Sequence, residues 1–307
     1  MKSQGPIAIL LILVLIAVAI LAFTTAEHLT PNQAQIFKML LVIAGSLALY
    51  CFVVGELTKN VSQVDKLWSI APIVYAGYVA YASDFEVRTS LIAILVAIWG
   101  LRLSYNFSRR GGYTWKFWTG EEDYRWEVLR NDPKFQRPWV WSLFNLSFIC
   151  GYQMALILYF TLPILLTVDP IRGTELQLGD YIIAGCMIGF IIMETIADQQ
   201  QYEFQSMKYA LLNKGDELPA PYNKGFITSG LWSKMRHPNY FAEQAIWICV
   251  YAFSVIASGQ WINWTIGGVI LLIILFRGSS NFSESISAEK YPAYLEYQKK
   301  VSRFLPF

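Results

Sequence analysis

Long apolar runs recur along this sequence and limit what the chain can fold into. A membrane-spanning helix needs about 20 consecutive, mostly apolar residues. Runs of this kind lie at residues 7–23, 36–55, 67–82, 89–107, 139–167, 179–197, 239–258 and 261–276. The sequence therefore predicts an all-α, polytopic membrane protein, a bundle of helices without a separate soluble domain or an internal repeat.

Composition supports this class and excludes others. The chain has 307 residues, of which 55% are hydrophobic and 15% charged, and its formal net charge is +2. So small a charge, without a basic run, gives no sign of nucleic-acid binding. The four cysteines lie far apart in apolar runs without a CxxC pair, and there are two histidines. We therefore expect no disulfide framework and no metal centre, which excludes the histidine-rich di-iron membrane enzymes.

The first apolar run, residues 7–23, has two interpretations. It resembles a signal peptide because residues 24–26 are small, but it is long for one, and its positive flank is the single Lys2. We expect a retained membrane helix. The predicted domains are this N-terminal helix with a short loop, residues 1–34, and a membrane domain with a C-terminal tail, residues 35–307.

Basic residues alternate between the loops. Seven lie in 108–138, five in 199–237 and four in the tail after Gly278, whereas 83–88 and 168–178 have one each. Cytoplasmic loops carry the excess of lysine and arginine. With eight spans, both termini and the basic loops are then expected in the cytoplasm.

The stretch 229–247 places polar side chains at the mouth of a membrane helix, where they are costly and usually functional. Pro238 suits the first helical position, because its missing N–H would be unpaired there, and His237 before it should stand at the boundary. Four side chains at offsets 0, 3, 4 and 7 then share one helix face, namely Arg236, Asn239, Tyr240 and Glu243. Together with the imidazole they form a set that suits a phosphorylated cofactor.

Charged residues also stand at the ends of three other runs. Asp65 does not face its neighbour Lys66 on a helix, so it either has another partner or is a plain interfacial charge. Arg102 lies in the last turns of its helix and either meets an anion or snorkels to the surface. Glu194 and Asp198 are one helical turn apart and repel each other, which an arginine or ribose hydroxyls would offset.

Two further segments combine aromatic with charged residues. Asp123 and Arg125 belong to a loop that suits either a solvated face or the phosphate and ring of a ligand. Tyr291, Tyr294 and Tyr297 recur at every third position, which an amphipathic tail lying on the membrane would explain without any activity. These acids, bases and aromatics all fall on one side of the membrane, which favours a polar cavity facing the cytoplasm.

Taken together, these motifs resemble the steroid 5α-reductase superfamily, and within it a bacterial branch of uncharacterised membrane proteins, the DUF1295 group. The resemblance is carried first by 236–240 (RHPNY) with Glu243, preceded by 230–232 (GLW) and followed by 291–292 (YP) and 304–306 (FLP). Further blocks match that branch at 64–68 (VDKLW), 99–102 (WGLR), 122–125 (EDYR) and 197–200 (ADQQ). The resemblance extends over residues 35–307.

The resemblance implies a seven-helix reductase-like core, here with one extra N-terminal helix, and NADPH as the cofactor. Asn239, Glu243 and Asp198 match cofactor-binding positions of the family, and Arg277 approximately matches a basic cofactor contact. Arg236 is then a natural partner for a phosphate. Proximity and loop chemistry add the remaining members of the predicted cofactor set, which are Arg102, Asp123, Arg125, His237, Tyr240, Asn281 and Glu284.

The predicted catalytic residues are Asp65 and Tyr105. The family uses a carboxylate, followed seven residues later by a proline, to orient the substrate ketone together with a tyrosine. Asp65 and Pro72 keep this spacing with Asp in place of Glu, whereas Trp99 stands near the tyrosine position, and an indole cannot act as a phenolic acid. We expect burial to raise the pKa of Asp65, so that the protonated acid donates a hydrogen bond to the substrate carbonyl, assisted by Tyr105.

The implied activity is NADPH-dependent reduction of an enone-type carbon–carbon double bond in a lipid-like hydrophobic substrate, on the cytoplasmic side of a bacterial inner membrane. An alternative is an S-adenosylmethionine-dependent methyltransferase of the isoprenylcysteine or phospholipid type, which also carries an Arg-His-Pro-x-Tyr segment. Those enzymes usually have adjacent glutamates in the tail, whereas Glu284 and Glu289 are separated. A non-catalytic membrane protein is the third alternative.

Overall fold

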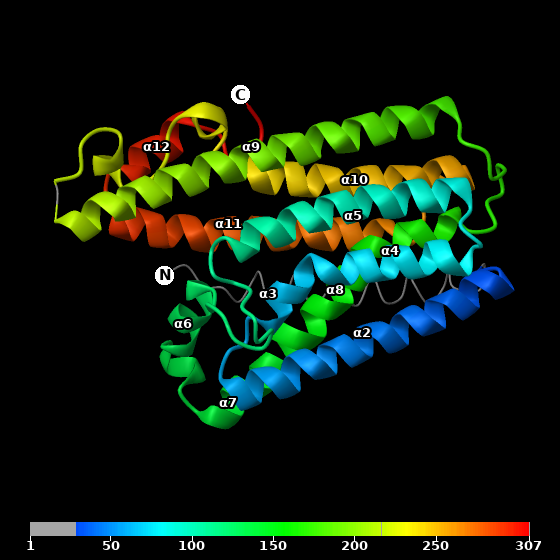
Figure 1. Ribbon diagram of the computed structural model, residues 1–307, viewed down its shortest axis with the longest axis horizontal. Coiled ribbons are helices and arrows are strands. Elements are labelled where there is room, and N and C mark those ends of the chain that lie inside the picture. The colour runs from blue at the N-terminus through cyan, green and yellow to red at the C-terminus, as the bar shows by residue number, and fades with distance from the viewer. Residues whose placement is uncertain (1–28, 216, 307) are drawn as a thin grey trace. The chain divides into compact units, whose positions relative to one another are not determined.

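The computed structural model describes residues 29–215 and 217–306 (Figure 1). Within these ranges all regular structure is helical, without a β-strand and with one isolated bridge between Met235 and Ser302. The predicted all-α class is therefore confirmed. The first apolar run, residues 7–23, lies outside the described residues, so its retention as a membrane helix stays a prediction.

Six helical stretches in the described part of the chain are long and apolar enough to cross a membrane. They are α2 (Pro31–Thr58), α5 (Val87–Ser108), the composite stretch Pro138–Thr167, α9 (Leu178–Lys214), α10 (Pro238–Ser258) and α11 (Ile266–Lys290). They contain 21 to 37 residues, and a bilayer core requires about 20. The protein is an integral membrane protein with several spans.

The composite stretch changes its winding along its length. It consists of α7 (Pro138–Phe144), π-helical turns η3 (Asn145–Tyr152), α8 (Gln153–Thr161) and tighter turns η4 (Leu162–Thr167). α8 ends two residues before Pro163, whose ring clashes with the carbonyl four residues earlier in a regular helix. The helix therefore changes from α-helical to tighter turns at this proline.

The apolar run 67–82 does not form one continuous span, which corrects the expectation. The chain breaks between α3 (Gln63–Trp68) and α4 (Ile70–Ala82). Pro72 explains the break, because a proline cannot donate to the carbonyl four residues earlier, which here belongs to Trp68. α4 has 13 residues, and at 1.5 Å per residue it measures about 20 Å, less than the roughly 30 Å of a bilayer core.

α9 is longer than its apolar run predicts. The run ends at residue 197, but the helix continues to Lys214, because residues 199–214 are mostly good helix formers. The helix stops before Gly215, whose φ of 76° suits a glycine at a helix C-terminus. The first half of the predicted loop 199–237 is therefore helical.

The connection between α10 and α11 is also longer than predicted. The apolar runs 239–258 and 261–276 leave only residues 259 and 260 between them, whereas α11 begins at Ile266. The side chain of Asn263 accepts hydrogen bonds from the backbone N–H and the hydroxyl of Thr265. This local turn occupies the residues that were expected to continue the helix.

The chain forms two compact units. The first contains the described residues up to Ala184 together with Val250–Leu271. In it, α8 packs against α2 and α4, and α4 packs against α5 (Figure 1). α4 and α5 approach closely at Gly100, where an added Cβ would lie 2.5 Å from the carbonyl oxygen of Ser69.

A buried ion pair in the first unit joins the start of α5 to the start of α9. Arg88 donates through Nε and Nη2 to the carboxylate of Asp180, each at 3.0 Å, and both side chains are fully buried. Arg88 also donates to the carbonyls of Gly173 and Glu175. Because its charge and donors are satisfied in this way, the buried arginine fixes the loop that precedes α9.

The second unit contains Gly185–Cys249 and the described residues from Leu272 onward. Here α12 (Tyr294–Lys300) folds back beside the loop that follows α9 (Figure 1). Tyr294 and Tyr297 are buried against Phe226, and the Tyr297 hydroxyl donates to the carbonyl of Trp232. The tyrosine periodicity of the tail therefore reflects packing within the protein, which explains it without a membrane-lying helix.

Candidate functional site

The start of α10 is joined to the C-terminal tail in the second unit. Pro238 is the first residue of the helix, and His237 lies just before it, as predicted. The backbone N–H groups of Arg236 and His237 donate to the carbonyls of Ser302 and Arg303, at 2.9 and 3.1 Å. The tail therefore runs alongside the segment that leads into α10 and fixes its backbone.

Glu284 on α11 is the centre of a buried polar group that we name the Glu284 cluster. Its carboxylate accepts from Arg236 Nε at 2.7 Å, His237 Nε2 at 2.9 Å, Gln298 Nε2 at 2.9 Å and Arg303 Nη2 at 2.9 Å. Glu284 is 2% exposed. A carboxylate buried so deeply needs opposite charge and hydrogen-bond donors, and here it has both.

The partners of Arg236 are all supplied by the chain itself. Besides Glu284, its guanidinium donates through Nη1 to the carbonyls of Gln298 and Val301. The sequence singled out Arg236, His237 and Glu284 as cofactor contacts, and the structure brings the three together around one carboxylate. Sequence reasoning missed Gln298 and Arg303, because nothing in the tail indicates that it folds back onto α11.

His237 is a neutral member of this cluster. Burial lowers the pKa of its imidazole, and the nearby Arg236 and Arg303 act in the same direction, which outweighs the opposing effect of Glu284. Its ring stacks on Tyr240, with centroids 5.2 Å apart and planes at 13°. The imidazole therefore connects Glu284, by a hydrogen bond, to the first turn of α10, by stacking on Tyr240.

A second polar group lies between α9 and α10. Asn239 Nδ2 donates to Asp198 Oδ1 at 3.2 Å, and Glu243 Oε1 accepts from Trp247 Nε1 at 3.1 Å. Glu194, Asp198 and Glu243 are each less than 5% exposed. Three buried carboxylates and an amide on facing helices form a site rich in acceptors, and such groups suit the hydroxyls of a sugar.

The two other predicted residues of this unit lie on α11. Arg277, Asn281 and Glu284 are at offsets 0, 4 and 7 and so share one face of the helix. Arg277 is exposed, and the side-chain oxygen of Asn281 accepts from Arg303. Whether any of these side chains contacts a cofactor stays a prediction.

In the first unit, α3 and α6 (Tyr124–Arg130) are held in register. Glu122 accepts from the backbone N–H of Val61 at 2.8 Å, and the Asp123 N–H donates to Ser62 Oγ at 2.9 Å. One turn further along, Trp126 Nε1 donates to Asp65 Oδ2 at 2.8 Å. Each of these pairs is 61 positions apart in the sequence, so the two segments run side by side in the same direction.

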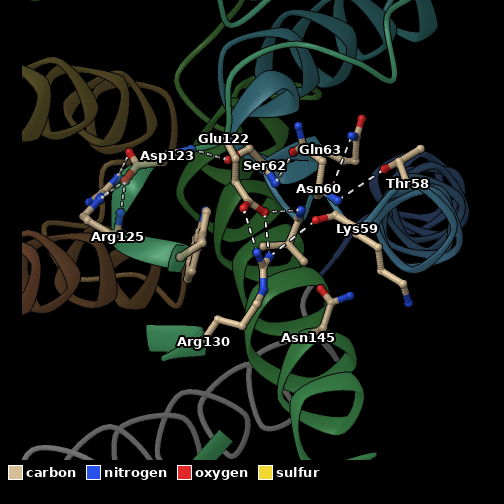
Figure 2. A network of polar contacts seen from close by, with 12 residues as sticks. Thr58, Lys59, Asn60, Ser62, Gln63, Glu122, Asp123, Arg125, Arg130 and Asn145 are labelled. Carbon is tan, nitrogen blue, oxygen red and sulfur yellow. Dashed lines mark hydrogen bonds and ion pairs between the residues drawn. The ribbon is translucent and has the colours of Figure 1, made fainter. Parts of the chain in front are cut away.

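Two acid–arginine pairs hold α6 in place (Figure 2). Arg125 donates to both oxygens of Asp123, each at 2.8 Å, and Arg130 donates to Glu122 at 2.9 and 3.1 Å. The Asp123 side chain also caps α6 by accepting from the Arg125 N–H at 2.9 Å. The sequence left a solvated face and a ligand site open for this loop, and the structure shows that it contacts the segment before α3.

Lys66 connects α3 to the loop that precedes α6. It is fully buried, and its Nζ donates to the carbonyls of Phe117 and Thr119 at 2.8 and 2.6 Å. The Tyr113 hydroxyl returns a hydrogen bond to the Lys66 carbonyl at 2.6 Å. Gly120 permits this fold, because its φ is +122° and a Cβ there would lie 2.6 Å from the carbonyl oxygen of Gly112.

The pKa values of the two carboxyls at this contact are shifted in opposite directions. Burial raises the pKa of Asp65, and the negative charge of Asp123 raises it further, against smaller opposing effects of Arg125, Ser62 and Trp126. Burial also acts to raise the pKa of Asp123, but the hydrogen bonds and charge of Arg125 outweigh it and hold that pKa below its usual range. We name Ser62, Asp65, Asp123, Arg125 and Trp126 the Asp65 cluster.

The remaining predicted residues of the first unit lie on α5. Trp99 is fully buried, and Arg102 lies partly buried in the last turns of the helix, as expected. Tyr105 is 68% exposed, and the Arg109 guanidinium lies over its ring at 5.7 Å from the centroid. Sequence reasoning missed Ser62, Lys66 and Trp126, whose importance depends on the contact between α3 and α6.

An apolar cavity of about 550 Å³ also belongs to the first unit. It is lined by α2, by η3 and α8, and by residues at the start of α11. The rings of Tyr159 and Trp264 stack within its wall, with centroids 6.2 Å apart, and Phe37 contacts Trp264 edge-on. A cavity of this size and character suits an apolar ligand such as a lipid.

The family to which the chain belongs follows from comparison with known proteins. The model of a protein family of unknown function, DUF1295, matches residues 51–301, which include the residues of both clusters except Arg303. The chain belongs to the DUF1295 family. An uncharacterized protein of the fission yeast Schizosaccharomyces pombe, C594.04c, is 35% identical over 269 residues, covering 81% of this chain and 73% of the yeast protein.

Membership of DUF1295 carries no activity with it, because the family is described as one of unknown function. The similar protein comes from a yeast, and the predicted bacterial membrane stays a prediction. The search of solved structures found no match. Within residues 29–215 and 217–306, no group of three or more His, Cys, Asp or Glu side chains could hold a metal ion.

Proposed function

We propose that this DUF1295 protein is a membrane-embedded, NADPH-dependent reductase that acts on an enone-type carbon–carbon double bond in a lipid. The observation that carries the proposal is the Asp65 carboxyl, which accepts from Trp126 at 2.8 Å and lies near Asp123, whose charge raises the pKa of Asp65. A raised pKa favours the protonated carboxyl, which can donate a hydrogen bond to a carbonyl oxygen. Such a donor stabilises the negative charge that this oxygen acquires during reduction.

Asp65 is assigned the role of polarising the substrate carbonyl. NADPH, when bound, supplies a hydride to the carbon of the double bond that lies β to the carbonyl. As the carbonyl oxygen becomes an enolate oxygen, the Asp65 O–H hydrogen bond to it strengthens. The enolate then takes a proton from water at its α-carbon, which yields the saturated ketone and leaves Asp65 protonated.

The acceptors between α9 and α10 support the choice of a nucleotide cofactor. Asp198, Asn239 and Glu243 are buried or half-buried and offer carboxylate and amide groups, which fit the hydroxyls of a ribose. Phosphates need cations, and Arg277 on α11 is an exposed one. Within the second unit we therefore assign ribose recognition to these three residues and phosphate recognition to Arg277.

A lipid substrate is supported by the apolar cavity of the first unit. Its lining includes Phe37, Leu41, Met154 and Trp264, and its volume of about 550 Å³ falls within the range of ligand sites, about 300–1,000 Å³. Lipids reach such a cavity directly from the membrane. By the distribution of basic loops, we place the cofactor side of the protein in the cytoplasm.

Cofactor binding to the purified protein in detergent tests the proposal. The melting temperature is compared without ligand and with NADPH, NADH or S-adenosylmethionine. A ligand that binds the native state raises the free energy of unfolding by mass action, by about 2.7 kcal/mol at a concentration of 100 times Kd, and the melting temperature rises with it. We expect a shift with NADPH that Asp198→Ala abolishes. The exposed Glu203 on the same helix provides the matched control, and Glu203→Gln should keep the shift.

Two outcomes would overturn the proposal. A shift with S-adenosylmethionine alone would indicate a methyltransferase, the alternative left open by the Arg236–Tyr240 segment. A protein that responds to none of the three ligands would be a non-catalytic member of the family. An NADPH shift, in contrast, leads directly to a screen of enone lipids in which NADPH consumption is followed by absorbance.

A further inference from the structure

We infer that α6 is a positioning element for Asp65, in which the Trp126 indole selects the carboxyl oxygen that carries the proton and Asp123 keeps the proton on it. This inference deepens the proposed function, since it concerns the acid assigned to the substrate carbonyl. It gives Asp123 and Arg125 a role within the protein that differs from cofactor binding, for which the sequence had singled them out.

The register between α3 and α6 is the geometric basis. Two hydrogen bonds, from Val61 to Glu122 and from Asp123 to Ser62, fix the start of α6 against the start of α3. Trp126 then lies one helical turn from its cap, at the level of Asp65. Because these two hydrogen bonds fix the backbone of α6, the position of the indole N–H at the Asp65 carboxyl is set by the backbone as well as by the Trp126 rotamer.

The chemistry of the indole decides between the two oxygens of Asp65. An indole N–H is a donor only, so the oxygen that it meets, Oδ2, must offer a lone pair. In a neutral carboxyl one oxygen carries the hydrogen and the other is the better acceptor. We therefore place the hydrogen of Asp65 on Oδ1, so that Trp126 determines which atom can donate to a substrate; the Ser62 hydroxyl is the other hydrogen-bond partner of this carboxyl.

Asp123 supplies the charge that favours the neutral acid. Its carboxylate is fixed by Arg125 through two hydrogen bonds of 2.8 Å, and a fixed negative charge disfavours a second one nearby. The titratable groups that face Asp65 are Asp123 and Arg125 from α6, Lys66 from α3 and the Cys51 thiol from α2. The Lys66 ammonium is turned to the carbonyls of Phe117 and Thr119.

The two residues should shift the titration of Asp65 in opposite directions. Trp126→Phe keeps an aromatic ring but removes the N–H, which favours the ionised carboxylate, so the midpoint should rise. Asp123→Asn removes the repelling charge and leaves Arg125 unneutralised, so the midpoint should fall. We expect shifts of about 1 pH unit, the usual spread of carboxyl pKa values in folded proteins.

The measurement is the infrared carbonyl band of protonated Asp65 in the full-length protein, followed as a function of pH. The band is identified by its absence from Asp65→Asn. In Trp126→Phe it should also move to higher frequency, because its oxygen loses a hydrogen bond. Glu127→Gln, an exposed charge change on the same helix, is the matched control and should leave the band and its midpoint unchanged.

The outcomes separate this inference from the proposed function. Unchanged midpoints in both variants, or shifts in the same direction, would overturn the inference even if the protein reduces enones. Opposite shifts in a protein that neither binds NADPH nor consumes it would uphold the control of Asp65 by α6 and remove the reductase. If Trp126→Phe fails to fold, the downward shift in Asp123→Asn decides the inference, since no shift there would overturn it.

Discussion

The Glu284 cluster and the Asp65 cluster both contain a carboxyl group that the protein largely surrounds, but they treat it in opposite ways. Glu284 accepts from two arginines, a histidine and a glutamine, so its negative charge is compensated where it lies. Asp65 has an indole as its donor and another carboxylate beside it. The first arrangement favours the ionised form of its carboxyl, and the second favours the protonated form.

The difference separates a structural role from a chemical one. A compensated carboxylate with several partners from distant segments holds those segments together, and in the Glu284 cluster they are the start of α10, α11 and the tail. A neutral acid contributes less to cohesion but can donate a proton in a hydrogen bond. Mutations in the two clusters should therefore differ in whether stability or activity changes more.

The largest effect is expected from Glu284→Ala. Breaking a buried pair leaves Arg236 and Arg303 without their counter-charge, so the free energy of unfolding should fall by about 3–5 kcal/mol. Tryptophan fluorescence during thermal melting in detergent measures this loss. Glu296→Ala is the control, because its ion pair with Lys299 at 2.8 Å is exposed and should matter little. Equal losses in the two variants would contradict a structural role of the Glu284 cluster.

The next largest effect is expected from Asp65→Ala, and it should appear in activity and not in the free energy of unfolding. Loss of a hydrogen-bond donor to a developing oxyanion lowers kcat by about 10²–10³-fold. The kcat of Asp65→Asn should lie between those of Asp65→Ala and the unsubstituted protein, since an amide still donates a hydrogen bond but less strongly than an acid. The assay is NADPH consumption with an enone lipid, with melting temperature measured in parallel. A melting temperature that falls while kcat per folded molecule stays constant would show that Asp65 has a structural role and no chemical one.

The smallest effects are opposite dependences of stability on pH. The raised pKa of Asp65 means that the native state holds its proton more firmly than the unfolded chain, whose value is 3.8. Its stabilising contribution is present below 3.8 and is lost as the pH rises through the higher native value. The lowered pKa of His237 acts in reverse: its contribution is present above 6.5 and is lost as the pH falls towards the native value.

Variants test these two signs separately. Asp65→Asn should remove the loss of stability on the alkaline side of 3.8, and His237→Gln the loss on the acidic side of 6.5. Each unit of pKa shift corresponds to about 1.4 kcal/mol. Melting temperatures recorded across this pH range, relative to the unsubstituted protein, give both curves. Parallel curves for Asp65→Asn and the unsubstituted protein would show that Asp65 titrates normally.

Proline positions were the most reliable guides in the sequence. Pro238 begins α10, as predicted, and Pro163 follows shortly after the end of α8. Pro72 produced an equally local break between α3 and α4, but the apolar run around it concealed the effect. A proline acts on the carbonyl four residues away, so its consequences can be read from the sequence once it is considered by itself.

The partners of the charged side chains were not predictable in this way. The sequence selected Arg236, His237 and Glu284 for a cofactor, yet it gave no reason to expect that Arg236 and Glu284, 48 positions apart, contact each other. It selected Asp65 without its partner Trp126, which is 61 positions away. Both contacts depend on how helices and tail pack, and a spacing rule along one helix contains no information about that.

The sequence by itself determined that this is a helical membrane protein and where most of its helices begin, because bilayer thickness and helix period act on neighbouring residues. The tertiary structure decided which charged groups are compensated. The segment before α10 placed Arg236 and His237 on Glu284, the tail added Arg303, and alignment of α6 with α3 placed an indole and a carboxylate beside Asp65. The energy of a buried charge depends on its neighbours in space, so chemical roles arose only with the fold.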